Sequence, residues 1–146
     1  MKKIVVLVLL LNSCSISEPT ISLLDSYELP EGITTLSEAW QYVDKLPYVA
    51  EIGGKNVWQK PSTTMVRGGD CEDLAVLLAL CAEKLGYTSF VVIEFGLSAN
   101  HAICYIYINR QYRYLEPQQY GKYYTKEELE IVDIYSIENA LEMCTE

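Results

Sequence analysis

The hydrophobic residues of this chain recur every three or four positions in two separate segments, a spacing that predicts two amphipathic helices. The first begins at Thr35, with Glu38 at capping-box spacing, and ends before Pro47. The second begins near Cys71 and stops at Gly86. Because the second segment is apolar on almost every side, we expect it to be the central, buried helix.

Downstream of Gly86 the pattern changes to runs of β-branched and aromatic residues, which predict strands. Three such runs begin at Ser89, His101 and Tyr112, and residues 109–111 form a short polar connection between the last two. This connection predicts a hairpin. Helices followed by an antiparallel meander indicate an α+β fold, in which the central helix packs on one side of a sheet.

Two parts of the chain are less regular. Residues 51–69 carry paired glycines at both ends and Pro61 inside, which predicts a loop, and the bulky Val57 and Trp58 favour an ordered one. Towards the C-terminus the pattern predicts a turn or short helix, then a strand, then a helix, over residues 125–129, 130–137 and 136–143.

The N-terminus has the features of a secretory signal. Lys2 and Lys3 precede an apolar run over residues 4–11, which is too short to span a bilayer. The next four residues, Leu-Asn-Ser-Cys, resemble the lipobox of bacterial lipoproteins, in which the cysteine is lipidated; here that residue is Cys14. Ordinary secretion, with cleavage nearby, is the alternative.

These features predict the organisation of the chain. We expect a lipoprotein signal peptide in residues 1–13, a tether in residues 14–31 and one domain in residues 32–146. The mature protein would be exported, to the periplasm or the cell surface, and held at the membrane by the lipid on Cys14. We expect it to act as a monomer.

Composition limits the partners. The chain has 20 Asp and Glu against 11 Lys and Arg, and without residues 1–13 its formal charge is about −11. Nucleic acid is therefore not an expected partner, because phosphate binding needs a basic face. Among the cysteines, Cys81 and Cys104 lie in apolar segments and are expected to be buried, whereas Cys144 is expected to be exposed.

Cys71 stands at the start of the central helix, next to three acids rather than within the apolar stripe. The free N–H groups of a helix start lower the pKa of a thiol, whereas the carboxylates of Asp70, Glu72 and Asp73 raise it. A neighbouring imidazolium or a cation would resolve this conflict. A cysteine in this position is a candidate nucleophile, and the alternative is a well-capped helix start.

His101, the only histidine, is the candidate base for Cys71, and Glu116 is the candidate residue to orient its ring. A hairpin centred near residue 110 pairs positions whose numbers sum to about 218–220. This register places Glu116 opposite residues 102–104, one step from His101.

The segment from Trp58 to Tyr87 contains Gly-Asp-Cys-Glu-Asp at the start of the central helix, and it resembles the catalytic segment of the transglutaminase-like superfamily. It is most similar to bacterial transglutaminase-like cysteine proteases, and the similarity extends to Pro117. The resemblance implies a papain-like fold with a Cys–His–Asp triad, in which Cys71, His101 and Glu116 stand at the three positions. Glutamate replaces the usual aspartate, which puts the activity in doubt.

The resemblance has two further implications for the site. It implies an oxyanion donor from the loop before the cysteine, supplied by Gln59 or the indole of Trp58, beside the backbone N–H of Cys71. Some relatives bind calcium through acids around the cysteine, and the acids at these positions are Asp70, Glu72 and Asp73. No cofactor is required by the expected mechanism, and calcium is the candidate ligand.

We therefore expect an exported cysteine hydrolase, a peptidase acting on a protein or peptide amide through Cys71, His101 and Glu116. If an amine replaced water, the same site would cross-link amides. A non-catalytic binding module that kept the fold is the alternative from another class. A cell-wall peptide hydrolase of the NlpC type, which also uses Cys and His, is a third.

Overall fold

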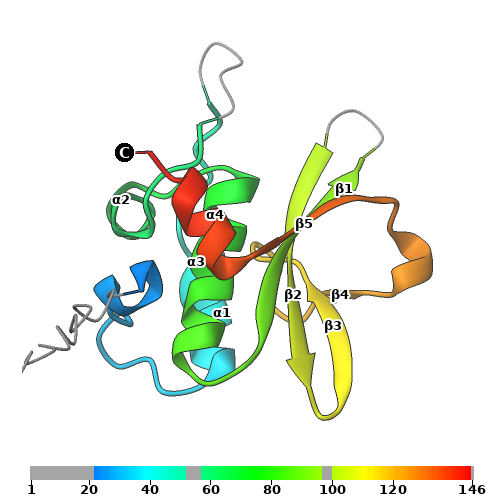
Figure 1. Ribbon diagram of the computed structural model, residues 1–146, viewed down its shortest axis with the longest axis horizontal. Coiled ribbons are helices and arrows are strands. Elements are labelled where there is room, and N and C mark those ends of the chain that lie inside the picture. Colours follow the sequence, from blue (N-terminus) through cyan, green and yellow to red (C-terminus); the bar gives the residue numbers. More distant parts are fainter. Residues whose placement is uncertain (1–21, 52–56, 97–99, 146) are drawn as a thin grey trace, which may run out of the picture.

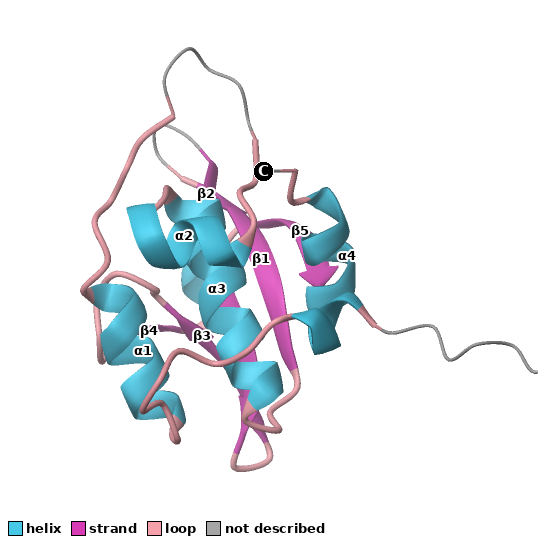
Figure 2. Ribbon diagram, turned by 90° about the vertical axis from the view of Figure 1, so that its left-hand side faces the viewer, coloured by secondary structure: helices cyan, strands magenta, loops and turns pink. Residues whose placement is uncertain are grey.

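The described part of the chain forms two layers, with four α-helices packed on one face of an antiparallel sheet (Figures 1 and 2). The computed structural model describes residues 22–51, 57–96 and 100–145. The sheet has five strands in the order β4-β3-β2-β1-β5. This arrangement confirms the α+β class expected from the sequence, with the cysteine-bearing helix at the centre.

Both helices predicted from periodicity are present with their predicted caps. Helix α1 covers Leu36–Asp44, and its first turn is closed by a capping box between Thr35 and Glu38. Helix α3 covers Cys71–Lys84, with Asp70 as the N-cap. Gly86, with a φ of 88°, follows the last turn, as expected of a glycine at a helix C-terminus.

Four strands follow the predicted runs: β1 (Ser89–Phe95), β2 (Asn100–Ile108), β3 (Gln111–Leu115) and β5 (Ile131–Ser136). The two-residue strand β4 (Tyr123–Tyr124) was not predicted. Asn109 and Arg110 both have positive φ, which is the backbone of a two-residue hairpin turn. The β2–β3 ladder pairs Ile108 with Gln111 and Cys104 with Leu115. The predicted register is therefore confirmed.

The C-terminal segment crosses to the far edge of the sheet. After the 3₁₀ turn η2 (Lys126–Glu128), β5 pairs with β1 rather than continuing beyond β4. Helix α4 (Ile137–Met143) follows and packs against α3. The two edges of the sheet are thus formed by β4 and β5, and β1 and β2 lie inside it (Figure 1).

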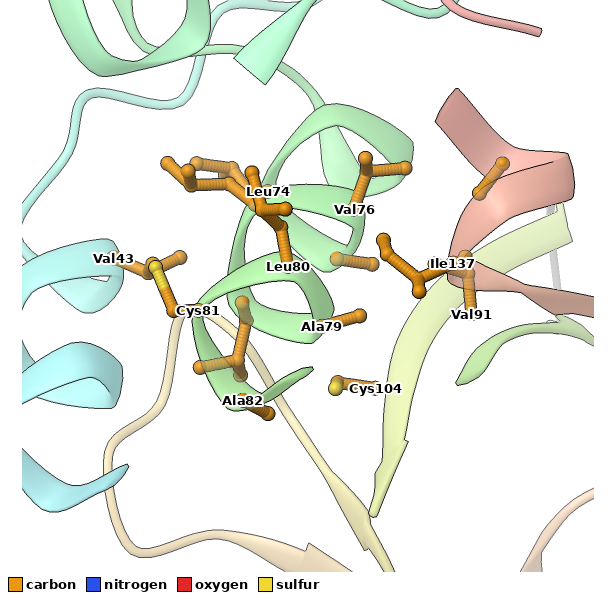
Figure 3. Close-up of a cluster of buried hydrophobic side chains, with 14 of the residues drawn as sticks. Val43, Leu74, Val76, Ala79, Leu80, Cys81, Ala82, Val91, Cys104 and Ile137 are labelled. Atoms are coloured by element: carbon orange, nitrogen blue, oxygen red, sulfur yellow. The ribbon is translucent and has the colours of Figure 1, made fainter. Parts of the chain in front are cut away.

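The core lies between α3 and the sheet. Nearly the whole of α3 is inaccessible to solvent, and its side chains meet α1 on one side and β1, β2 and α4 on the other (Figure 3). Cys81 and Cys104 are both buried in this cluster as free thiols, as predicted. Burial of so many aliphatic side chains fixes α3, and with it the position of Cys71 at its N-terminus.

Two expectations from the sequence are wrong. Residues 61–67, predicted as part of a loop, form helix α2 (Pro61–Arg67), which begins with proline at a position where no N–H is needed. Cys144 is buried rather than exposed, because α4 turns its last residues back to the core, where the thiol donates to the carbonyl of Ala140.

The expected signal peptide, with Cys14, lies outside the described residues. The second half of the expected tether contains a short 3₁₀ helix, η1 (Leu23–Ser26), and Leu24, Tyr27 and Leu29 pack against the core. Within the described ranges, no helix combines the length and apolar character needed to cross a bilayer.

Candidate active site

The start of α3 is held against the end of α1 by two glycines. Gly68 has a φ of 76°, and a side chain there would overlap the carbonyl of Pro47. Gly69 donates to the same Pro47 carbonyl at 3.2 Å, and a Cβ on it would collide with Asp73. These close approaches explain why the paired glycines precede the cysteine, and they set where the helix begins.

Cys71 is the first residue of α3 and is only partly buried. Its thiol donates to Oε2 of Glu72 at 2.9 Å. Burial and this hydrogen bond raise the pKa of Cys71 to about 12, against a smaller lowering by the backbone amide of Ala102. Burial and the neighbouring carboxylates therefore outweigh the helix start, and the resting thiol is protonated.

The contact between Cys71 and Ala102 brings the cysteine to β2, one residue along the strand from His101. His101 Nε2 lies 2.7 Å from Oε2 of Glu116, the residue that follows β3. Cys71 therefore lies against β2, and the residue before its contact on that strand belongs to the histidine–carboxylate pair. Within the described residues, no hydrogen bond engages His101 Nδ1.

The His101–Glu116 pair is partly shielded from water, since Glu116 is only 5% exposed. The hydrogen bond from Glu116 raises the pKa of His101 and outweighs the effect of burial. Burial acts to raise the pKa of Glu116, but hydrogen bonds from His101 and Tyr124 lower it below its ordinary value. The carboxylate is therefore ionised and favours the imidazolium.

Several contacts that the sequence did not reveal hold Glu116 in place. Its N–H donates to the carbonyl of Lys122 at 3.2 Å, and its carbonyl accepts from the indole of Trp40 at 2.7 Å. The hydroxyl of Tyr124 donates to Glu116 Oε2 at 2.8 Å. The turn between β3 and β4 provides the contact from Lys122, and β4 itself provides Tyr124. No periodicity in the sequence points to either.

The two expected oxyanion donors occupy different environments. The backbone N–H of Gln59 donates to Asp73 Oδ1 at 2.7 Å, and its side-chain amide donates to Asp73 Oδ2. Trp58 is buried in the core, where its ring packs edge-on against Tyr135 and its indole N–H has no partner among the described residues. The amide of Gln59 is thus fixed beside the first turn of α3.

Open pockets adjoin Gln59 on two sides. One, of about 490 Å³, is lined by α2 and includes Ser62 and Thr63; the other, of about 380 Å³, includes Val49 and Val57. Gln59 and Arg67 contribute to both. Neither pocket is lined by Cys71, His101 or Glu116.

The acids expected to bind calcium are engaged in other contacts. Asp70 and Asp73 form the reciprocal capping box of α3, and Asp73 also binds Gln59. Glu72 accepts from the thiol. Across the described ranges, no three His, Cys, Asp or Glu side chains group so as to hold a metal ion. In this arrangement the three acids do not fit a calcium site.

Comparisons with known proteins support the fold. No family model matches the chain, and neither does any curated protein. Among solved structures, it is similar to Legionella pneumophila LapG, with 17% identity and a TM-score of 0.59 over 69% of this chain and 63% of LapG. It is also similar to calcium-bound LapG, with 19% identity and a TM-score of 0.61 over 77% of this chain and 70% of that protein.

An EGTA-treated LapG structure is similar over 69% of this chain, with 16% identity and a TM-score of 0.57. In the first and last of these matches the chain spans 63% and 64% of the length of LapG. At such identities the likeness concerns the fold alone. The chain therefore has an α+β fold similar to that of LapG.

Proposed function

We propose that this protein is an exported cysteine hydrolase of transglutaminase-like type, which cleaves a protein or peptide amide. The observation that carries the proposal is the pairing of His101 with Glu116 at 2.7 Å on the strand that Cys71 contacts. The fold likeness to LapG, a transglutaminase-like cysteine protease, supports the same class.

In the proposed reaction, Cys71 attacks the amide carbonyl and passes its proton to His101, whose ring Glu116 orients. The raised pKa of His101 favours this transfer. The backbone N–H of Cys71 and the amide of Gln59 stabilise the negative oxygen of the tetrahedral intermediate. His101 then protonates the leaving amine, and water hydrolyses the acyl-enzyme.

The protonation of the resting thiol determines when its proton is transferred. Because the pKa of Cys71 is about 12, the proton must move to His101 as the C–S bond forms, rather than before substrate binds. The same observation favours the rival function, a binding module whose cysteine is not a nucleophile. The two functions differ in whether His101 governs the reactivity of Cys71.

The first experiment compares cleavage of a peptide library by the wild type, Cys71→Ala and His101→Ala, with products read by mass spectrometry. We expect cleavage by the wild type alone. Iodoacetamide labelling of Cys71, quantified on its peptide across pH, is run on the wild type and His101→Ala. No cleavage, together with labelling that is indifferent to His101, would establish the binding module instead.

Export, and anchoring through a lipid on Cys14, are parts of this proposal that rest on the N-terminal sequence. Metabolic labelling with a fatty-acid analogue tests them, since a signal lost in Cys14→Ser would locate the lipid. Label retained in that variant would refute lipidation at Cys14.

Calcium is tested separately, because one of the similar LapG structures is calcium-bound. Binding at Asp70 and Asp73 would require their capping box to open. Calorimetric titration with calcium should therefore show heat only if α3 rearranges at its start. Heat that persists in Glu72→Gln would place the ion elsewhere.

A further inference from the structure

Tyr124 shares with His101 a single carboxylate oxygen. Its hydroxyl lies 2.8 Å from Glu116 Oε2, and His101 Nε2 lies 2.7 Å from the same atom. Among the residues that the structure describes, the other oxygen, Oε1, accepts only from the backbone N–H of Gln118, at 3.5 Å. The two strong contacts to Glu116 therefore converge on one oxygen, and one of them comes from Tyr124.

The fold presents Tyr124 to Glu116 through a tight turn. After Glu116 the chain reverses, with Lys122 donating to the carbonyl of Gln119 at 2.9 Å and Gly121 at a φ of 87°. Strand β4 then pairs with β3, which places Tyr124 beside Tyr114. The hydroxyl is thus held by backbone pairing rather than by a flexible loop.

Tyr124 stays in its neutral, donating form. Burial and the neighbouring Glu116 carboxylate raise the pKa of Tyr124, and they outweigh the opposing effect of Lys122, whose ammonium lies 4.7 Å from the ring centroid. A neutral phenol next to an ionised carboxylate donates one strong, charge-assisted hydrogen bond.

The hydrogen bond from Tyr124 is relevant to the presence of glutamate, at Glu116, where the family resemblance implies aspartate. Glutamate has one more methylene, and one more rotatable bond, than the aspartate that the family resemblance implies, so it would hold a histidine less firmly by itself. We propose that Tyr124 is a positioning residue, which holds the Glu116 carboxylate against His101 and so compensates for the longer side chain.

The inference rests on the proposed function for its consequence in catalysis, but the positioning itself can be measured without any substrate. Because the chain has one histidine, the imidazole signals in an NMR titration belong to His101 alone. The charged or titratable groups that act on His101 or on its carboxylate partner are Glu94 of β1, Glu116, Lys122 and Tyr124.

The direction in which the pKa of His101 changes in Tyr124→Phe tests whether Tyr124 positions the Glu116 carboxylate. If the carboxylate moves away once the hydroxyl is lost, the pKa of His101 falls towards 6.5, and we expect a fall of roughly half a pH unit or more. If the carboxylate stays in place, it gains charge density, and the pKa of His101 rises or is unchanged. Either of these two results would overturn the inference.

Tyr123→Phe is the matched control, because Tyr123 is the other residue of β4 and its ring packs on Trp40 at 5.2 Å. Its hydroxyl makes no hydrogen bond within the described residues, so the titration of His101 should not change. Glu116→Asp is the second variant. Aspartate is too short to contact both partners, so the pKa of His101 should fall, and adding Tyr124→Phe should lower it no further.

In the cleavage assay, Tyr124→Phe should lower kcat about tenfold and leave KM unchanged, because the carboxylate acts on proton transfer and not on substrate binding. A wild type without cleavage would defeat the proposed function and leave the NMR result standing. A wild type that cleaves, with His101 unmoved in Tyr124→Phe, would defeat the positioning role alone.

Discussion

The thiol of Cys71 illustrates how burial and a neighbouring carboxylate can reverse a simple expectation. A helix N-terminus lowers the pKa of a thiol, yet burial and the hydrogen bond to Glu72 raise that of Cys71 to about 12. The partial charge of a helix end is smaller than the full charge of a carboxylate in contact. Burial, with the hydrogen bond to Glu72 as the next contribution, therefore keeps the resting thiol protonated.

Replacing Glu72 with glutamine tests this directly. The amide removes the charge and the strong acceptor, so the pKa of Cys71 should fall from about 12 towards its ordinary value of 9.0. The pH dependence of iodoacetamide labelling at Cys71, followed by peptide mapping, measures it. Glu127→Gln, at an exposed acid in η2, is the control, and an unchanged labelling profile in Glu72→Gln would contradict the assignment.

Asp70 gives a second prediction at this scale. Burial and the charges of Glu72 and Asp73 raise the pKa of Asp70 to about 7. A carboxyl with a raised pKa in the folded state binds its proton more tightly there than in the unfolded chain. Its contribution to stability is thus present below about pH 4 and is lost as the pH rises through about 7.

The free energy of unfolding of the wild type, relative to Asp70→Asn, should accordingly decrease between about pH 4 and 7. Urea unfolding at several pH values measures this difference. Asp25→Asn, on the exposed side of η1, provides the control for a general charge effect. If this difference in the free energy of unfolding is constant, or grows with pH, then the pKa of Asp70 is not raised by folding.

At the scale of elements, α3 carries both the core and the site. Its middle is inaccessible to solvent, and its first turn presents Cys71, capped by Asp70 and anchored to Gln59 through Asp73. The rigidity of the site thus depends on packing several turns away. This coupling arises because a helix transmits the position of its core residues along its axis.

Leu78→Ala should lower the free energy of unfolding by about 2–5 kcal/mol, because Leu78 is completely buried and its truncation leaves a cavity. Val66→Ala on α2 is the matched control: the side chain is 83% exposed, and its loss should cost less than about 0.5 kcal/mol. Chemical denaturation measures both. Similar values for the two variants would be inconsistent with α3 as the centre of the core.

Most helices and strands were predictable, because each depends on a local pattern. The capping boxes at Thr35 and Asp70 and the glycine after α3 mark helix ends in the sequence itself. Helix α2 was missed because it has only seven residues, too few for a helical period to stand out next to glycines and a proline.

At the scale of the whole molecule, the two ends of the described chain close the core. Segment 22–29 packs against the core through Leu24, Tyr27 and Leu29. Its 3₁₀ helix η1 contacts α4, which lies near the C-terminus. Cys144 is buried by the same closure. The folded unit therefore extends further towards the N-terminus than the polar sequence of this segment indicates.

A protein that begins at Gly32 should consequently be less stable than one that begins at Ser22. Three half-buried side chains are lost, which corresponds to about 2 kcal/mol or more of apolar burial. Thermal unfolding of the two proteins measures the difference. Equal melting temperatures would mean that residues 22–31 serve only as a connection.

The sequence alone determined the features that depend on neighbouring residues: the start and end of α3, the β2–β3 register and the candidate trio Cys71, His101 and Glu116. Register follows from a two-residue turn because each step away from it pairs one residue from each strand. The resemblance, which the fold supports, then suggested a cysteine hydrolase.

Only the tertiary structure decided what surrounds that trio. The crossing of β5 to the edge next to β1 and the convergence of His101 and Tyr124 on Glu116 join residues from different elements. Such contacts depend on side-chain direction and on distances of a few tenths of an ångström. No periodicity along the chain encodes them, and they set the protonation state of the site.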